Sequence, residues 1–385
     1  MPGLRPFVSV PWSVRGASAR RLAPAFLAVV SVAVLGAAIG VALPGCSRQP
    51  RFVPASADSS LAVPRDSLAE QVRILDERWS AAGGGEEAAR LTARVLLQDL
   101  RVRLAAGSQA EWEGRARTLL DSLDVGAEFA SAGCALAVNF FSRSDPTAGS
   151  WPWVFWCDGT TAQAQAVEGA GMGLVGLAAR GLSPEPSAGG NLAGIAALFA
   201  RRAGGGQQPL LLAWRVAGER LELTQTLGPD SLGGVGTGAF GTAGDSLVVL
   251  TTRTWKPTPR FDECATCPHV FHERRFRWAL EGFEGFEDAL VPTPYVAFVQ
   301  LIQALTLGDR DGAVERVTRP ALVESARRAG WATVKGSWRA APGSAERGDE
   351  LVFYRGVNEA WKVRFERRGE SWRVDSFEAT TRVID

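Results

Sequence analysis

The residues best suited to chemistry in this sequence lie within one short segment, residues 264–272, which reads CATCPHVFH. The segment holds both histidines of the chain, His269 and His272, and two of its five cysteines, Cys264 and Cys267. In an oxidising compartment the two cysteines favour a structural disulfide that pins the loop between two strands. Alternatively, Cys264, Cys267, His269 and His272 offer thiolate and imidazole ligands to a borderline-soft ion such as zinc. A redox-active cysteine pair is a third interpretation. Covalent haem is excluded, because Pro268 stands where that motif needs a histidine.

A second pair of cysteines, Cys134 and Cys157, flanks a hairpin-like stretch in a strand-rich part of the sequence. The two could form a disulfide across it, or stay reduced as small buried hydrophobes. Among the possible pairings of these four cysteines we expect the two local ones.

Aromatic side chains are dense in residues 151–156, WPWVFW. Trp151, Trp153 and Phe155 would share one face of a strand, because successive side chains point to opposite faces. Such a stripe could stack on a sugar ring or another flat ligand. The alternative is core packing, because indole rings bury a large apolar area.

The remaining motifs give no catalytic constellation. Residues 236–241, GTGAFG, match the dinucleotide fingerprint, but a strand rather than a helix follows, so we expect a flexible glycine loop. A Ser-His-Asp arrangement would have to use a histidine beside the cysteines, and no G-x-S-x-G elbow occurs. The sequence therefore leans against an enzyme and predicts no cofactor.

The predicted cellular localisation of the protein follows from its first 46 residues. Residues 23–43 form the one apolar run long enough for a targeting segment, with Arg15, Arg20 and Arg21 before it and Leu43-Pro44-Gly45-Cys46 at its end. A basic start, an apolar middle and small residues at the end are typical of a secretory signal. The alternative is an uncleaved transmembrane helix, because the run approaches the length that a bilayer needs.

The end of this segment resembles the signal of bacterial lipoproteins, whose lipobox is matched by Leu43, Gly45 and Cys46. The resemblance implies a signal peptide over residues 1–45, cleavage before Cys46, and diacylglycerol plus an acyl chain on that cysteine. It also implies a cell-envelope protein facing the periplasm or the exterior, with membrane lipid as its partner. Ser47 after the cysteine suggests transport to the outer membrane.

The charge of the exported chain limits its partners. The leader carries four arginines and no acidic residue, so its removal lowers the formal charge from +1 to −3. A slightly acidic chain is a poor binder of nucleic acid. We therefore expect no nucleic-acid partner.

The composition and hydrophobic periodicity of the predicted mature chain change along its length. Residues 46–65 are polar and proline-dotted, as in a flexible tether. Residues 66–124 have helical periodicity and predict a helical hairpin. Residues 125–290 predict an all-β domain, sandwich-like or barrel-like, with a tight turn at residues 216–220. Its expected strands are residues 135–141, 153–157, 173–179, 195–201, 210–216, 221–226, 247–252 and 276–280.

Residues 291–385 predict helices followed by an antiparallel sheet. Thr293 can cap a helix that begins at Pro294 and ends at Gly308, and a second helix would span residues 320–330. Strand-like runs follow at residues 331–338, 351–354, 361–365 and 372–377, with a turn at residues 368–370. This order, with the closing GESWRV of residues 369–374, resembles the NTF2-like fold, which implies a sheet and helices around a pocket. Tyr295, Tyr354 and Asp375 are the candidates for such a pocket.

The predicted fold class is therefore multidomain α+β, with an N-terminal helical hairpin, an all-β middle domain and a C-terminal NTF2-like domain. The predicted function is a membrane-anchored exported lipoprotein with a non-enzymatic binding or envelope-assembly role, and an envelope protein as a possible partner. Two alternatives stay open. One is a ligand-binding or catalytic NTF2-like domain, and the other is a metal- or redox-active module at residues 264–272.

Overall fold

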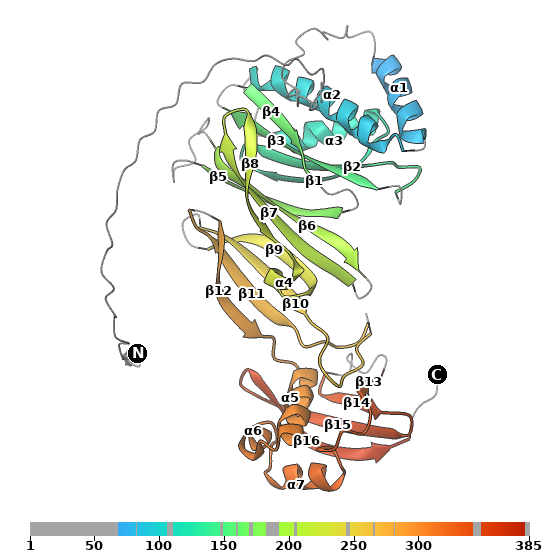
Figure 1. The fold of residues 1–385 in the computed structure, drawn as a ribbon, viewed down its shortest axis with the longest axis vertical. Helices are drawn as coiled ribbons and strands as arrows, with labels where there is room; N and C mark the ends of the chain where they lie inside the picture. Colours follow the sequence, from blue (N-terminus) through green and yellow to red (C-terminus); the bar gives the residue numbers. More distant parts are fainter. Residues whose placement is uncertain are drawn as a thin grey trace, which may run out of the picture. The chain divides into compact units, whose positions relative to one another are not determined.

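The computed structural model describes residues 68–381, apart from 82, 106–110, 147–148, 159–160, 169–171, 182–191, 204–205, 244–246, 265, 281 and 342–347. Within these residues, sixteen strands form four antiparallel sheets of four strands each, and seven helices accompany them (Figure 1). The expected α+β class is therefore wrong: the described chain is mostly β. The predicted signal peptide, the predicted lipidation site Cys46 and the predicted tether lie outside the described residues.

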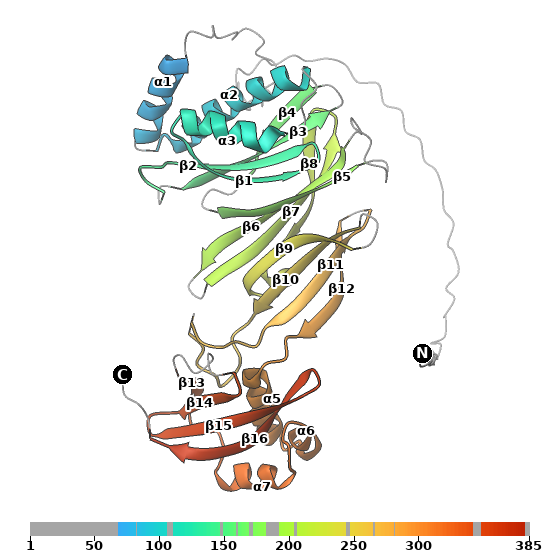
Figure 2. The same cartoon turned by 180° about the vertical axis from the view of Figure 1, so that it is seen from behind.

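The first sheet has the order β1-β2-β3-β4 and is covered on one face by helices. Its strands are β1 (Gly126–Ala132), β2 (Ala135–Phe141), β3 (Ser150–Asp158) and β4 (Thr161–Ala166). The helices are α1 (Leu68–Ser80), α2 (Gly85–Ala105) and α3 (Trp112–Ser122) (Figure 2). Leu75, Leu96 and Leu120 of these helices share a core with Leu136 and Phe155 of the sheet. The expected N-terminal helical hairpin is thus corrected to a helical layer, because its apolar faces are buried against strands.

The second sheet lies between the first and the third. It consists of β5 (Met172–Gly181), β6 (Leu192–Ala203), β7 (Gly206–Ala217) and β8 (Arg220–Leu227), in that order. Side chains of β6 alternate between two cores. Ile195 and Phe199 pack towards Trp156 of the first sheet, whereas Ala196 and Leu198 pack towards the third sheet. Burial on both faces explains why β6 reads as a nearly continuous apolar run.

The third sheet has the order β12-β11-β10-β9 and follows the short helix α4 (Pro229–Leu232). Its strands are β9 (Val235–Ala243), β10 (Leu247–Trp255), β11 (His272–Trp278) and β12 (Phe283–Leu290). The glycine loop expected at residues 236–241 is wrong, because those residues belong to β9. The packing there is close, since a Cβ on Gly238 would lie 3.1 Å from Cδ2 of Leu198 in the neighbouring sheet.

The fourth sheet and three helices form the C-terminal part. The helices are α5 (Pro294–Leu307), α6 (Arg310–Glu315) and α7 (Ala321–Arg328), and the strands β13 (Trp338–Ala340), β14 (Glu350–Arg355), β15 (Glu359–Arg368) and β16 (Ser371–Thr380). The expected caps of α5 are confirmed: the Thr293 hydroxyl accepts from the Val296 N–H, and Gly308 has φ +73°. The strand expected over residues 331–338 is wrong, since pairing begins only at Trp338.

The space expected to be an NTF2-like pocket is filled. Phe298 of α5 stacks on Phe353 of β14, with ring centroids 3.7 Å apart, and Trp331 is fully buried between Trp338, Trp361 and Phe377. Trp372 packs against the same core. In place of an open cone, this part therefore has a solid aromatic core.

Candidate functional site

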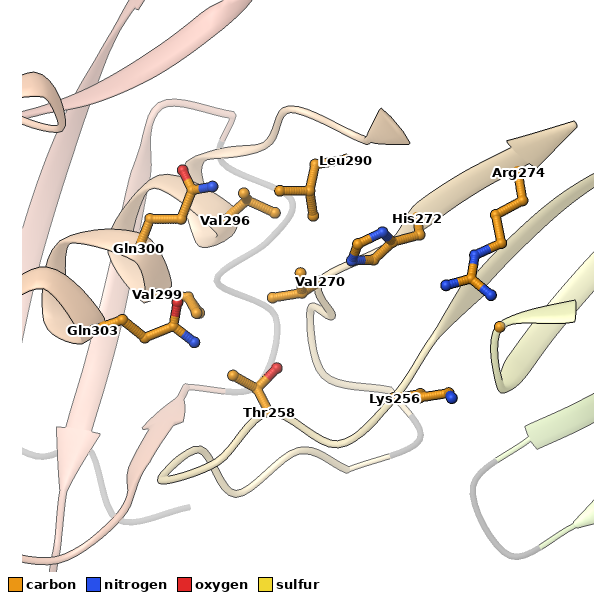
Figure 3. A pocket seen from close by; sticks show the side chains of 11 residues that line it. Lys256, Thr258, Val270, His272, Arg274, Leu290, Val296, Val299, Gln300 and Gln303 are labelled. Atoms are coloured by element: carbon orange, nitrogen blue, oxygen red, sulfur yellow. The ribbon is translucent and has the colours of Figure 1, made fainter. Parts of the chain in front are cut away.

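A hollow of about 260 Å³ lies between the third sheet and α5 (Figure 3). We refer to it as the junction hollow. Its walls come from four places: the end of α4, the segment that follows β10, the strands β11 and β12, and one side of α5. The lining residues are Gly233, Lys256, Thr258, Val270, His272, Arg274, Leu290, Val296, Val299, Gln300 and Gln303.

One end of the junction hollow is cationic. His272 and Arg274 are two residues apart on β11 and therefore point to the same face of the sheet. Asp288, opposite Arg274 on β12, lies between them. Its Oδ1 is 2.9 Å from Nδ1 of His272, and its Oδ2 is 2.9 Å from Nε of Arg274. Lys256 is exposed, and its ammonium has no ion pair with any described residue.

Gly233 makes this end possible. It ends α4 with φ +104°, a conformation that side chains disfavour, and a Cβ there would overlap Oγ1 of Thr254. The same Cβ would lie 3.5 Å from Cδ of Arg274. Thr254 in turn donates its hydroxyl proton to the carbonyl of Leu232 at 2.9 Å. The end of α4 can thus lie close against β10 and leave room for the arginine.

The opposite end of the junction hollow carries two amides. Gln300 and Gln303 are three residues apart on α5 and so lie on one side of the helix. Neither amide forms a hydrogen bond with a described residue. Val296 and Val299 of the same helix, with Val270, provide apolar walls between the amides and the cationic end (Figure 3). The junction hollow is therefore polar at both ends and apolar in the middle.

A buried polar cluster holds the two walls together. The side chain of Glu263 is only 2% exposed. Its Oε1 accepts the Tyr295 hydroxyl proton at 2.9 Å, and its Oε2 accepts the N–H of Thr258 at 3.3 Å. Burial chiefly, and then the charge and hydrogen bond of Glu263, raise the pKa of Tyr295 well above its usual range. Since Tyr295 belongs to α5 and Thr258 follows β10, the carboxylate links the helix to the strand segment.

The side chain of His269 makes packing contacts and is not oriented by a hydrogen bond to any described residue. Its ring stacks on Trp255, with centroids 3.6 Å apart. Its Nδ1 lies 3.6 Å from Oε2 of Glu263, which is too long for a hydrogen bond. Both ring nitrogens are buried and have no hydrogen-bond partner among the described residues. The ring therefore serves as a flat wall of the cluster.

The disulfide predictions are confirmed. Cys264 is bonded to Cys267, with Cα atoms 5.0 Å apart, and Cys134 to Cys157, with Cα atoms 5.6 Å apart. The four residues considered as metal ligands are dispersed. The two sulfurs are bonded to each other, His269 stacks on Trp255, and His272 pairs with Asp288. Among the described residues, no group of three or more His, Cys, Asp or Glu side chains is placed to hold a metal.

The aromatic stripe of β3 faces the helical layer. Phe155 is fully buried, and Trp151 and Trp153 pack against the same core. The ring of Trp151 lies 5.4 Å from that of Trp79 in α1, between centroids. Helices thus cover the stripe that was a candidate for ligand stacking. Two of the residues predicted for an NTF2-like pocket are held by hydrogen bonds within the fold. The Tyr295 hydroxyl donates to Glu263, and Oδ1 of Asp375 accepts the Thr318 hydroxyl proton at 2.9 Å.

Sequence reasoning singled out His272 but missed the residues that surround it. Lys256, Arg274, Gln300 and Gln303 come from three segments with no local motif. One signal was present, because the two glutamines interrupt the apolar sequence of α5, PYVAFVQLIQALTL. Polar residues at such a spacing indicate one side of the helix that does not enter the core.

No protein-family model matches the sequence. No curated protein is significantly similar to it. In the part of the chain that the structure describes, no helix has the length and apolar character to cross a membrane.

Proposed function

We propose that this protein is an exported lipoprotein, anchored through lipid on Cys46, that binds a small ligand in the junction hollow without converting it. The observation that carries the binding role is the lining of the hollow. Two side-chain amides and an ammonium without an ion pair among the described residues line a space with apolar walls, an arrangement typical of sites that orient a ligand.

A non-enzymatic role follows from the chemistry of the lining. The polar side chains are an ammonium, a guanidinium, an imidazole, a hydroxyl and two amides. The imidazole of His272 is held by Asp288, and among the described residues the Thr258 hydroxyl donates to no carboxylate or imidazole. The lining therefore supports recognition rather than acyl or glycosyl transfer.

Export is supported by two features. The two disulfides suit an oxidising compartment. The lipobox-like residues that end at Cys46 supply the anchor, with at least two acyl chains required for stable membrane attachment. The intact mass of the protein extracted from membranes tests this half of the proposal. A chain that begins at Cys46 and carries diacylglycerol supports it, whereas a water-extracted chain with residues 1–45 attached refutes it.

The binding half is tested by blocking the hollow. A library of small molecules would be screened for ligands that raise the melting temperature of the protein. Gln303→Trp places an indole in the hollow and should abolish the shifts. Gln98→Trp, at an exposed position of α2, is the matched control and should keep them. Shifts that survive Gln303→Trp, or a library without any ligand, would refute binding in the junction hollow.

A further inference from the structure

The charges around the junction hollow specify the kind of ligand, and this step rests on the proposed binding function. Asp288 uses one carboxylate oxygen for His272 and the other for Arg274. Glu263, behind Thr258, already accepts hydrogen bonds from Tyr295 and Thr258. With Asp288 paired to Arg274, the exposed Lys256 ammonium is the cation of the lining that forms no ion pair with a described residue.

We infer that the ligand is a small organic acid: a carboxylate held at the Lys256 end, an apolar body between the valines, and a hydrogen-bonding group at the two glutamines. Each part of the ligand is complementary to a different wall of the junction hollow. The ammonium attracts an anion, and the valine side chains favour a short branched hydrocarbon. The amides of Gln300 and Gln303 can both donate and accept hydrogen bonds.

The amount of charge favours a carboxylate over a phosphate. A phosphate group brings close to two negative charges at neutral pH and is usually held by several donors. Here the second cation, Arg274, is engaged by Asp288 and by the carbonyl of Ser231, with Nη1 3.3 Å from that oxygen. One free ammonium matches one carboxylate. The ligand class includes free acids and the carboxyl terminus of a polypeptide, which share this chemistry.

A pair of probes that differ only in charge tests the inference. N-acetyl-leucine has a carboxylate, a branched apolar body and an amide, whereas N-acetyl-leucinamide lacks the charge. Titration calorimetry should show the acid binding about tenfold more tightly, because a hydrogen bond to a charged group is worth more than a neutral one. High salt should weaken the binding of N-acetyl-leucine and leave the affinity for N-acetyl-leucinamide unchanged.

Variants locate the carboxylate. Lys256→Gln should remove the preference for the acid, and Lys256→Arg should restore most of it. Lys335→Gln, at an exposed position in the C-terminal part, is the matched control and should leave the affinity for both probes unchanged. A peptide ending in leucine, with a free or an amidated terminus, distinguishes the sources. Binding of the free-terminus peptide supports a polypeptide ligand, and binding of N-acetyl-leucine alone supports a free acid.

The outcomes that refute the ligand class differ from those that refute the binding function. Equal affinity for acid and amide, or an acid preference that survives Lys256→Gln, overturns the organic acid while leaving a ligand site in place. No binding of either probe at millimolar concentration also overturns it. The binding function itself is removed only by a library without any ligand or by shifts that survive Gln303→Trp.

Discussion

The hydrogen bond between Tyr295 and Glu263 should be a main link between α5 and the strand segment beside the junction hollow. Tyr295→Phe removes the hydroxyl that donates to the Glu263 carboxylate at 2.9 Å and leaves the ring in place. The aromatic contacts with Phe261 and Phe353, at centroid distances of 5.9 and 6.2 Å, can persist. The substitution therefore isolates one hydrogen bond without creating a cavity.

The expected loss of stability follows from the burial of the acceptor. Glu263 has only 2% of its side chain exposed, so water cannot replace the lost donor, and the N–H of Thr258 remains as a donor to this carboxylate. A hydrogen bond to a buried charged group contributes about 1.5–3 kcal/mol. We expect Tyr295→Phe to lower the free energy of unfolding by that amount at neutral pH.

The same link predicts a pH dependence in the alkaline range. The pKa of Tyr295 is raised in the folded protein, so the unfolded chain releases the phenolic proton first, at a pH of about 10. The contribution is fully present below that pH and is lost as the pH rises towards the folded pKa. The stability of the unaltered protein should then fall by about 1.4 kcal/mol per pH unit more steeply than that of Tyr295→Phe.

Urea unfolding at neutral pH and at a series of alkaline pH values, followed by tryptophan fluorescence, measures both effects. Glu263→Gln and the double variant complete a cycle that isolates the coupling between the two side chains. Two results would refute the account of this cluster. One is a Tyr295→Phe variant with an unchanged free energy of unfolding, and the other is a free energy of unfolding that falls equally steeply with alkaline pH in both proteins.

Three further predictions test the fold. Replacing Cys134 and Cys157 by serine opens a link across 23 residues and should lower the free energy of unfolding by about 3 kcal/mol in urea titrations; no change would contradict a formed bridge. Gly236→Ala should destabilise by roughly 1–3 kcal/mol, because φ is +152° and a Cβ would overlap the Arg253 backbone, whereas Gly241→Ala, with open space around it, should be tolerated; equal effects would argue for a loop. Trp331→Ala should cost about 3–5 kcal/mol by calorimetry, and a mild effect would indicate an unfilled core.

Elements with local chemical signals were predictable from the sequence. Thr293, Pro294 and Gly308 mark the ends of α5 because each acts through its own backbone and nearest neighbours. The turn at Gly218, with φ +62°, joins β7 and β8 for the same reason. The local pairing of the cysteines also followed from short separations.

Elements that depend on distant partners were not predictable. Residues 236–241 of β9 are rich in glycine, which disfavours strands, yet a Cβ at Gly236 would overlap the Arg253 backbone of the neighbouring strand. The helices of residues 68–122 have the period of a hairpin, but nothing in that period says that a sheet lies beneath them. The site was missed for a related reason: Lys256, Arg274 and Gln303 meet only after three elements have packed.

The construction of the junction hollow favours a ligand site over an accidental gap. Its strand wall and its helix wall are tied by the Tyr295–Glu263 hydrogen bond. Within the strand wall, the N–H of Val291 donates to the Phe271 carbonyl at 2.9 Å and extends the pairing of β11 with β12. The connecting loop is fixed in turn by backbone hydrogen bonds of Trp338 with Arg260 and Asp262, at 2.8 and 2.7 Å. A site whose walls are fixed before binding loses less conformational entropy when a ligand enters. The Cys264–Cys267 bridge restricts the conformations of the same loop. It therefore supports the proposed binding role even though neither cysteine lines the hollow.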